Sequence, residues 1–193
     1  MIPEDLRLTS AQYWWIAGIT ALLAGIYIVV LARRIQPDRF RQLYWPIVVA
    51  SAIFWTAYGL LLFALAWESF YVKFLPDPSQ RGLAGSVLEL LLYPPIGLAL
   101  WWLASRLPGK PAVTFCLLGG LEALPEHLWG IYRLGMLERV PFLRGVSATS
   151  VLAFAVPEYM LYWGTVLGLA LLLRTAWDWL RPGGNWRTGR RAG

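Results

Sequence analysis

Five apolar segments of about 20 residues each constrain the fold of this chain more than any other feature. They cover residues 13–32, 46–67, 83–104, 112–132 and 151–173. A helix of this length spans about 30 Å, which matches the hydrocarbon thickness of a bilayer. The pattern predicts an all-α polytopic membrane protein. We expect residues 1–193 to form a single membrane domain, a five-transmembrane-helix bundle with an internal lipid cavity.

The composition agrees with a membrane protein. Hydrophobic residues make up 58% of the chain and charged residues only 15%, against about 25% in ordinary soluble domains. These values exclude a disordered chain, a coiled coil and a DNA-binding module. The formal net charge of +6 therefore indicates topology and contact with anionic lipid head groups, and we expect no nucleic-acid partner.

Basic residues are distributed unevenly between the two sides of the predicted bundle. The loops after the first and third segments and the basic C-terminal tail, residues 174–193, carry Arg33, Arg34, Arg39, Arg41, Arg106, Lys110, Arg174, Arg181, Arg187, Arg190 and Arg191. The other side carries fewer: Arg7, Lys73, Arg81, Arg133, Arg139 and Arg144. The positive-inside rule predicts an integral membrane protein with its N-terminus outside and its C-terminus in the cytoplasm.

Ionisable residues inside the apolar segments are the main functional signal. They are Glu68, Glu89, Glu122, Glu126, His127 and Glu158. A charge at the bilayer centre costs at least about 2.5–3.5 kcal/mol on insertion scales. We therefore expect these groups to face the bundle interior, to pair with one another, or to be protonated.

Helical spacing places aromatic residues beside several of these acids. Tyr93 follows Glu89, and Tyr162 follows Glu158, by four residues, which puts each pair on one helix face. Prolines interrupt three of the segments and open space between helices. Together the acids and prolines predict one shared cavity. Its expected substrate-binding residues are Tyr93, Trp129, Tyr159, Tyr162 and Trp163.

This set of residues fits acid/base chemistry on an apolar alkene. A carboxylic acid in an apolar pocket is favoured in its neutral form, so it can deliver a proton near neutral pH. A second acid or His127 can accept a proton elsewhere, and aromatic faces stabilise the cation between them. The candidate catalytic residues are Glu89, Glu126, Glu158, His127 and Glu68. A structural polar network and a proton path are the alternatives for the same residues.

The sequence argues against metal and covalent cofactors. Cys116 is the only cysteine and His127 the only histidine, which excludes a thiolate cluster and a bis-histidine haem. Lys73 and Lys110 lie in predicted loops, which argues against a retinal Schiff base. We expect no metal site and no cofactor.

Four sequence elements carry a family resemblance. They are Trp67-Glu68-Ser69-Phe70-Tyr71, Leu88-Glu89-Leu90-Leu91-Leu92-Tyr93-Pro94-Pro95, Glu126 with Trp129 and Tyr132, and Tyr162 with Trp163. Over about residues 11–176 their order resembles the EXPERA superfamily, which includes emopamil-binding protein, a sterol isomerase, and a sigma-type receptor. The resemblance implies a sterol-binding bundle in which Glu68 and Glu89 handle protons and Trp163 faces a cation. The isomerase has a histidine where this chain has Ala64; His127 is a candidate replacement.

A second resemblance implies similar chemistry on another substrate. Leu124-Pro125-Glu126-His127 and Val156-Pro157-Glu158-Tyr159 are similar to the Pro-x-Glu-Glu element of small membrane lycopene cyclases. Both are one residue short and lack the paired acids. This resemblance implies protonation-triggered cyclisation of a carotenoid.

Non-catalytic functions remain open from the sequence. The chain can be a lipid-binding receptor, an accessory subunit of a membrane complex or a proton-coupled transporter; the lack of inverted-repeat symmetry disfavours the last. The expected partner is a membrane lipid or isoprenoid substrate. Gly18, Gly25, Gly164 and Gly168 offer small-residue faces for packing helices within the chain or in a homodimer.

Overall fold

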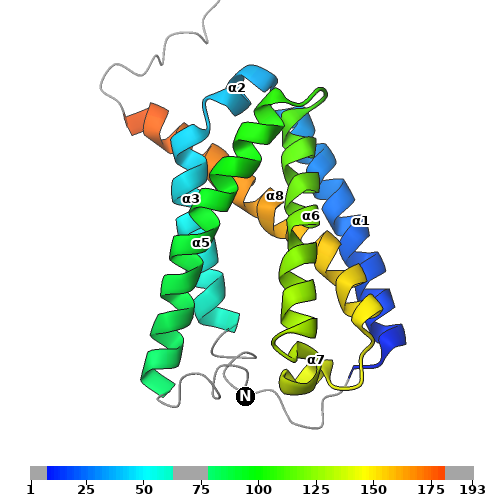
Figure 1. Ribbon diagram of the computed structural model, residues 1–193. Coiled ribbons are helices and arrows are strands. Elements are labelled where there is room, and N and C mark those ends of the chain that lie inside the picture. The colour runs from blue at the N-terminus through cyan, green and yellow to red at the C-terminus, as the bar shows by residue number, and fades with distance from the viewer. Residues whose placement is uncertain (1–7, 63–77, 181–193) are drawn as a thin grey trace, which may run out of the picture.

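The computed structural model describes residues 8–62 and 78–180, which form helices joined by short turns (Figure 1). The long helices are α1 (Ser10–Arg34), α3 (Tyr44–Leu62), α5 (Pro78–Arg106), α6 (Pro111–Tyr132) and α8 (Ala148–Leu180). The short ones are α2 (Pro37–Arg41), α7 (Met136–Arg139) and the 3-10 turn η2 (Pro141–Leu143). The described residues contain no strand, which confirms the all-α prediction for this part of the chain.

Each predicted apolar segment lies within one long helix, except residues 63–67, which fall outside the described ranges. Among the described residues, three helices are long and apolar enough to cross a membrane: α1, α3 and α8. In α6, the polar residues Glu122, Glu126 and His127 lower the hydropathy of an otherwise apolar helix. The structure thus supports membrane-spanning helices in this protein.

The long helices pack so that α8 touches most of the bundle. α3 lies along α5, whereas α8 crosses behind them and packs against α6, α1 and α3 (Figure 1). α2, the turn between α5 and α6, and the C-terminal end of α8 lie toward one end of the bundle, and α7 lies at the other (Figure 1). Successive long helices therefore alternate in direction.

Glycines allow close contact between α8 and its neighbours. A Cβ atom at Gly119 of α6 would collide with the indole of Trp163. The ring of Tyr27 from α1 packs against Gly164 of α8. A Cβ atom added at Gly164 would lie only 3.1 Å from that ring. Gly18 has nothing within 4 Å of such an atom. The glycine face of α8 is therefore used within the chain.

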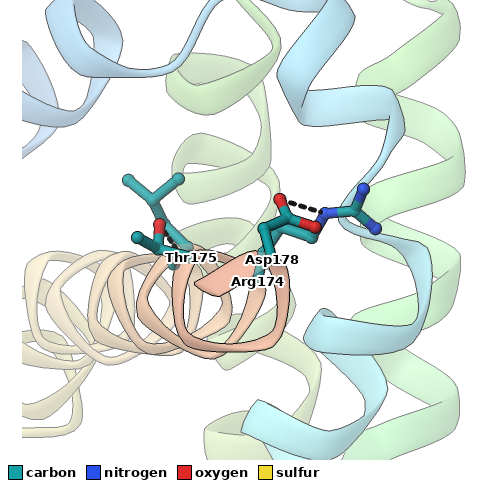
Figure 2. Close-up of polar contacts among 4 residues, drawn as sticks. Arg174, Thr175 and Asp178 are labelled. Carbon is teal, nitrogen blue, oxygen red and sulfur yellow. Dashed lines mark hydrogen bonds and ion pairs between the residues drawn. The ribbon is translucent and has the colours of Figure 1, made fainter. Parts of the chain in front are cut away.

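Hydrogen bonds define both ends of α8. The Ser147 hydroxyl accepts a bond from the Ser150 N–H at 3.1 Å, as an N-cap does. At the other end, Arg174 Nε donates to Asp178 at 3.0 Å across one turn (Figure 2). Thr175 also donates to a backbone carbonyl of the preceding turn, at 2.9 Å (Figure 2). The helix continues to Leu180, so the first residues of the predicted tail are helical.

Candidate functional site

A fully buried tryptophan on α3 forms the centre of the candidate site. Trp55 is 0% exposed, and Tyr93 of α5 stacks on it with ring centroids 3.7 Å apart and planes inclined by 9°. Tyr159 and Trp163 of α8 approach the same indole at 5.5 and 5.6 Å between centroids. Residues of three helices therefore meet at one ring.

A first chain of two tyrosines ends on a carboxylate of α6; we call it the Glu126 chain. The Tyr93 hydroxyl donates to both carboxylate oxygens of Glu126, at 2.9 and 2.8 Å, and lies 3.2 Å from the Tyr159 hydroxyl. Because the single hydroxyl proton of Tyr93 is directed at Glu126, Tyr159 is the donor to Tyr93. Both tyrosines are buried, whereas Glu126 is exposed.

A second chain of the same composition ends on α8; we call it the Glu158 chain. The Tyr58 hydroxyl donates to the Tyr162 hydroxyl at 2.9 Å. Tyr162 in turn donates to Glu158, one helical turn before it. The ring of Tyr58 also contacts Trp55 edge-on, with centroids 5.4 Å apart. Both acids that follow a proline in these helices, Glu126 and Glu158, thus accept from a two-tyrosine chain beside Trp55.

Two further acids flank the chains. Trp163 Nε1 donates to Glu122 Oε2 at 3.3 Å. Glu89 packs against Gly59, where an added Cβ would lie 2.6 Å from its Cγ. Glu89 Oε2 is buried and has no hydrogen-bond partner among the residues described. This oxygen is therefore free of the hydrogen bonds that occupy the other acids.

The acids are close enough to one another to interact electrostatically. Glu89 interacts with both Glu122 and Glu126, and Glu158 interacts with Glu126. None of these four carboxylates forms an ion pair with a lysine or arginine in the described part of the chain. Glu122, Glu126 and Glu158 are instead held by tryptophan and tyrosine donors.

The other predicted residues are placed less centrally. His127 Nδ1 bonds the Ala123 carbonyl at 2.9 Å, and its ring meets Tyr159 edge-on at 5.5 Å. A carbonyl oxygen only accepts hydrogen bonds, so Nδ1 carries a proton. The edge-on contact with Tyr159 places His127 at the edge of the cluster. Trp129 is 61% exposed on the outer face of α6. Glu68 and Ala64 lie outside the described residues.

Comparison of this chain with family models, curated proteins and solved structures finds no match. The resemblances to the EXPERA superfamily and to lycopene cyclases thus stay predictions from sequence. The functional argument rests on the geometry of the cluster.

Of the predicted substrate-binding residues, Tyr93, Tyr162 and Trp163 donate to acids and Tyr159 bonds Tyr93. Their role in binding stays a prediction, and two members of the cluster were not predicted from the sequence. These are Trp55 and Tyr58, one turn apart on α3. A signal was present, because Trp55 lies in mid-segment, whereas membrane tryptophans concentrate near segment ends. Within residues 8–62 and 78–180, no group of three or more His, Cys, Asp or Glu side chains is arranged to hold a metal ion.

The arrangement has two chemical capabilities. Carboxyl groups held by tyrosine hydroxyls are fixed in orientation, which general acid/base catalysis requires. The faces of the aromatic rings around Trp55 carry partial negative charge and stabilise a cation placed over them. Carboxyl groups and aromatic rings from four helices thus share one region of the bundle.

Proposed function

We propose that this protein is a membrane-embedded acid/base catalyst that isomerises or cyclises an apolar isoprenoid or sterol-like lipid. The observation that carries the proposal is the pair of tyrosine–carboxylate chains that flank the buried Trp55. Their acids have no cationic partner in the described residues, and the proposed five-span bundle would place them at membrane depth. Such acids are costly in a bilayer, which favours a functional explanation for them.

The proposed reaction moves one proton in and one proton out. Glu89, whose Oε2 is buried without a hydrogen-bond partner among the residues described, is favoured as the neutral acid and protonates an alkene carbon, so that a C–H bond forms and a carbocation results. Tyr93 keeps the Glu126 carboxylate oriented through its hydrogen bonds. Glu126, held as a carboxylate by Tyr93 and exposed, removes a proton from a neighbouring carbon, and the double bond reforms. The substrate gains and loses one proton, so the step is redox-neutral.

The two resemblances from sequence distinguish two substrate classes for this chemistry. A sterol-like substrate requires only a shifted double bond. A linear carotenoid requires ring closure before the proton is lost. Glu158, held by Tyr162, is the second acid available for either reaction, with His127 at the edge of the cluster as a further base.

The proposed setting is a five-span bundle in which α5 and α6 cross the bilayer with α1, α3 and α8. Of the polar residues of α6, Glu122 accepts from Trp163, whereas Glu126 accepts from Tyr93 and is exposed, which would give a lipid access to it. The end of the bundle that carries α2 faces the cytoplasm under the positive-inside rule.

A non-catalytic lipid-binding protein or accessory subunit is the second candidate. The observation in its favour is the burial of Trp55, Tyr93 and Trp163, which are at most 1% exposed. A closed aromatic core fits a protein that binds a lipid without turning it over. Turnover is therefore the property that separates the two candidates.

Product analysis tests the proposal. The protein is reconstituted in liposomes that contain sterols with a ring double bond or lycopene, and the lipids are extracted over time for mass spectrometry. We expect conversion of one lipid by the native chain and loss of conversion in Glu126→Gln. The matched control is Glu138→Gln on α7, an exposed acid outside the cluster.

Two results would overturn the catalytic assignment. One is full activity in both Glu126→Gln and Glu89→Gln with the fold retained. The other is a single unchanged lipid that copurifies with the protein, which supports the receptor instead.

A further inference from the structure

Exposed cations gather at the end of the bundle that carries α2. They are Arg33, Arg34, Arg39, Arg41, Arg106 and Lys110, and we call them the basic shelf. They come from the α1–α2 corner and the turn between α5 and α6, which lie toward the same end of the bundle (Figure 1). Asp38 is the single acidic residue within 33–41 and 106–110.

The shelf is held in place by the packing of α2. Phe40 is 0% exposed and lies between Trp101 and Phe115, with ring centroids 6.3 and 6.1 Å away. Trp101 Nε1 also donates to the Phe40 carbonyl at 2.9 Å. The neighbours of Phe40 in sequence, Arg39 and Arg41, are exposed. α2 thus presents two guanidinium groups from a fixed position.

Exposed tryptophans lie next to the cations of the basic shelf. The Arg106 guanidinium carbon lies 4.0 Å above the ring centroid of Trp102. Trp102 is itself 47% exposed, and Trp45, just after α2, is 67% exposed. Exposed tryptophans typically lie at the bilayer–water interface. In a bilayer whose interface lies at these tryptophans, the cations next to them would lie at the level of the lipid phosphates.

The opposite end of the bundle differs in its charges. There Arg144 Nε donates to the backbone carbonyl of Glu138 at 3.1 Å. Glu138 itself carries an acidic side chain. On the side of the shelf, Arg174 is paired with Asp178, but no described ion pair involves the six shelf residues. The shelf cations are thus exposed and free of ion pairs with the described residues.

We propose that the basic shelf is a binding site for the phosphate groups of anionic phospholipids. Guanidinium groups bind phosphate oxygens with paired hydrogen bonds. The shelf joins cations of two separate loops, which suits a lipid with two phosphates, such as cardiolipin, or two adjacent phosphatidylglycerols. This inference does not depend on the proposed catalysis, because the shelf and the acid cluster share no residue.

Direct binding measurements test the site. The purified full chain in a neutral detergent is titrated with fluorescent cardiolipin, phosphatidylglycerol or phosphatidylcholine, with inorganic phosphate as competitor. We expect cardiolipin and phosphatidylglycerol to bind in a salt-sensitive manner, and phosphatidylcholine not to bind. The double variant Arg39→Gln/Arg41→Gln should bind cardiolipin about tenfold more weakly, because each basic residue near an anionic surface adds to the attraction.

The matched control removes two exposed arginines from the opposite end, Arg133→Gln/Arg144→Gln, and should bind cardiolipin as the native chain does. Thermal unfolding of both variants without lipid checks that they fold. Unchanged binding in Arg39→Gln/Arg41→Gln, equal weakening in the control, or equal binding of phosphatidylcholine would overturn the proposal. Competition by inorganic phosphate at the lipid's own concentration would show a general anion site and reject a lipid site.

Discussion

At the scale of single residues, the tyrosine hydroxyls decide how the acids are held. Tyr93 gives its one proton to Glu126 while it receives a bond from Tyr159. Tyr162 donates a hydrogen bond to Glu158 and accepts one from Tyr58. In each chain the last hydroxyl is polarised by the one before it, which strengthens the bond to the carboxylate.

Tyr93→Phe isolates the contribution of one hydroxyl. The phenyl ring keeps its stacking on Trp55, whereas Glu126 loses its donor. Hydrogen bonds to charged groups contribute about 1.5–3 kcal/mol, so we expect lipid turnover to fall about 10- to 100-fold. The matched control is Tyr27→Phe, whose ring packs between α1 and α8. Equal activity in the two variants would show that Tyr93 does not position Glu126.

Trp55→Ala tests the centre of the cluster. Loss of a fully buried tryptophan typically costs about 3–5 kcal/mol of unfolding free energy. Trp129→Ala is the control, because Trp129 is 61% exposed and exposed substitutions usually change stability by less than about 0.5 kcal/mol. Denaturant unfolding in detergent micelles measures both. A similar cost for the two variants would contradict the central placement of Trp55.

Local spacing predicted only some of these contacts. Glu158 and Tyr162 bond as their four-residue spacing indicates. Glu89 and Tyr93 have the same spacing, but the Tyr93 hydroxyl bonds Glu126 of another helix. Spacing shows which residues share a face, whereas the partner depends on which helix packs there. Trp129 was predicted to bind substrate because it follows Glu126 by one turn; the structure leaves its side chain largely exposed, outside the cluster.

At the scale of helices, glycines determine how closely α6 and α8 approach. Gly119 packs directly against the Trp163 indole. A Cβ atom added at Gly120 would lie 2.5 Å from the Cγ atom of Met160. Close approach brings Trp163 within hydrogen-bond distance of Glu122. The small residues of α6 thus help to assemble the acid cluster.

Gly119→Ala should disturb this contact. The new methyl group meets a fully buried indole, and overpacking of this kind costs about 1–3 kcal/mol. Gly18→Ala on α1 is the matched control, because nothing lies within 4 Å of its new methyl group and alanine favours a helix over glycine. Unfolding free energies should therefore fall for the first and hold or rise for the second. Tolerance of Gly119→Ala would contradict the close α6–α8 contact.

The long helices could be predicted because about 20 consecutive apolar residues leave few other structures open. Their ends were harder to predict. α8 continues past the apolar segment that ends at residue 173 and reaches Leu180, just before the Pro182-Gly183-Gly184 sequence that predicts a helix end. The five-residue helix α2 is too short for a periodic pattern, and it is defined by the burial of Phe40.

At the scale of the whole molecule, the five long helices alternate in direction and place the basic shelf and the α7 region at opposite ends (Figure 1). The sequence could predict this alternation because consecutive segments are joined by short loops. It could not predict which helices are neighbours. The contact of α8 with α1, α3 and α6 depends on packing between residues far apart in the chain.

Cysteine labelling tests the proposed orientation in the membrane. Single cysteines are placed at exposed Thr9 and Lys110 in a Cys116→Ala background, since Cys116 is buried. A membrane-impermeant maleimide applied to intact cells should label Thr9→Cys and should reach Lys110→Cys only after permeabilisation. The reverse pattern, or labelling of both from one side, would contradict the proposed topology.

Isotope incorporation from solvent tests the central claim most directly. The claim is that acids meeting around Trp55 exchange protons with an apolar lipid. Protein reconstituted with its lipid in D2O should yield product with one deuterium on a carbon that was part of the original double bond. Glu126→Gln should yield none, and Glu138→Gln should match the native chain. A product without carbon-bound deuterium, or equal incorporation by Glu126→Gln, would contradict the account.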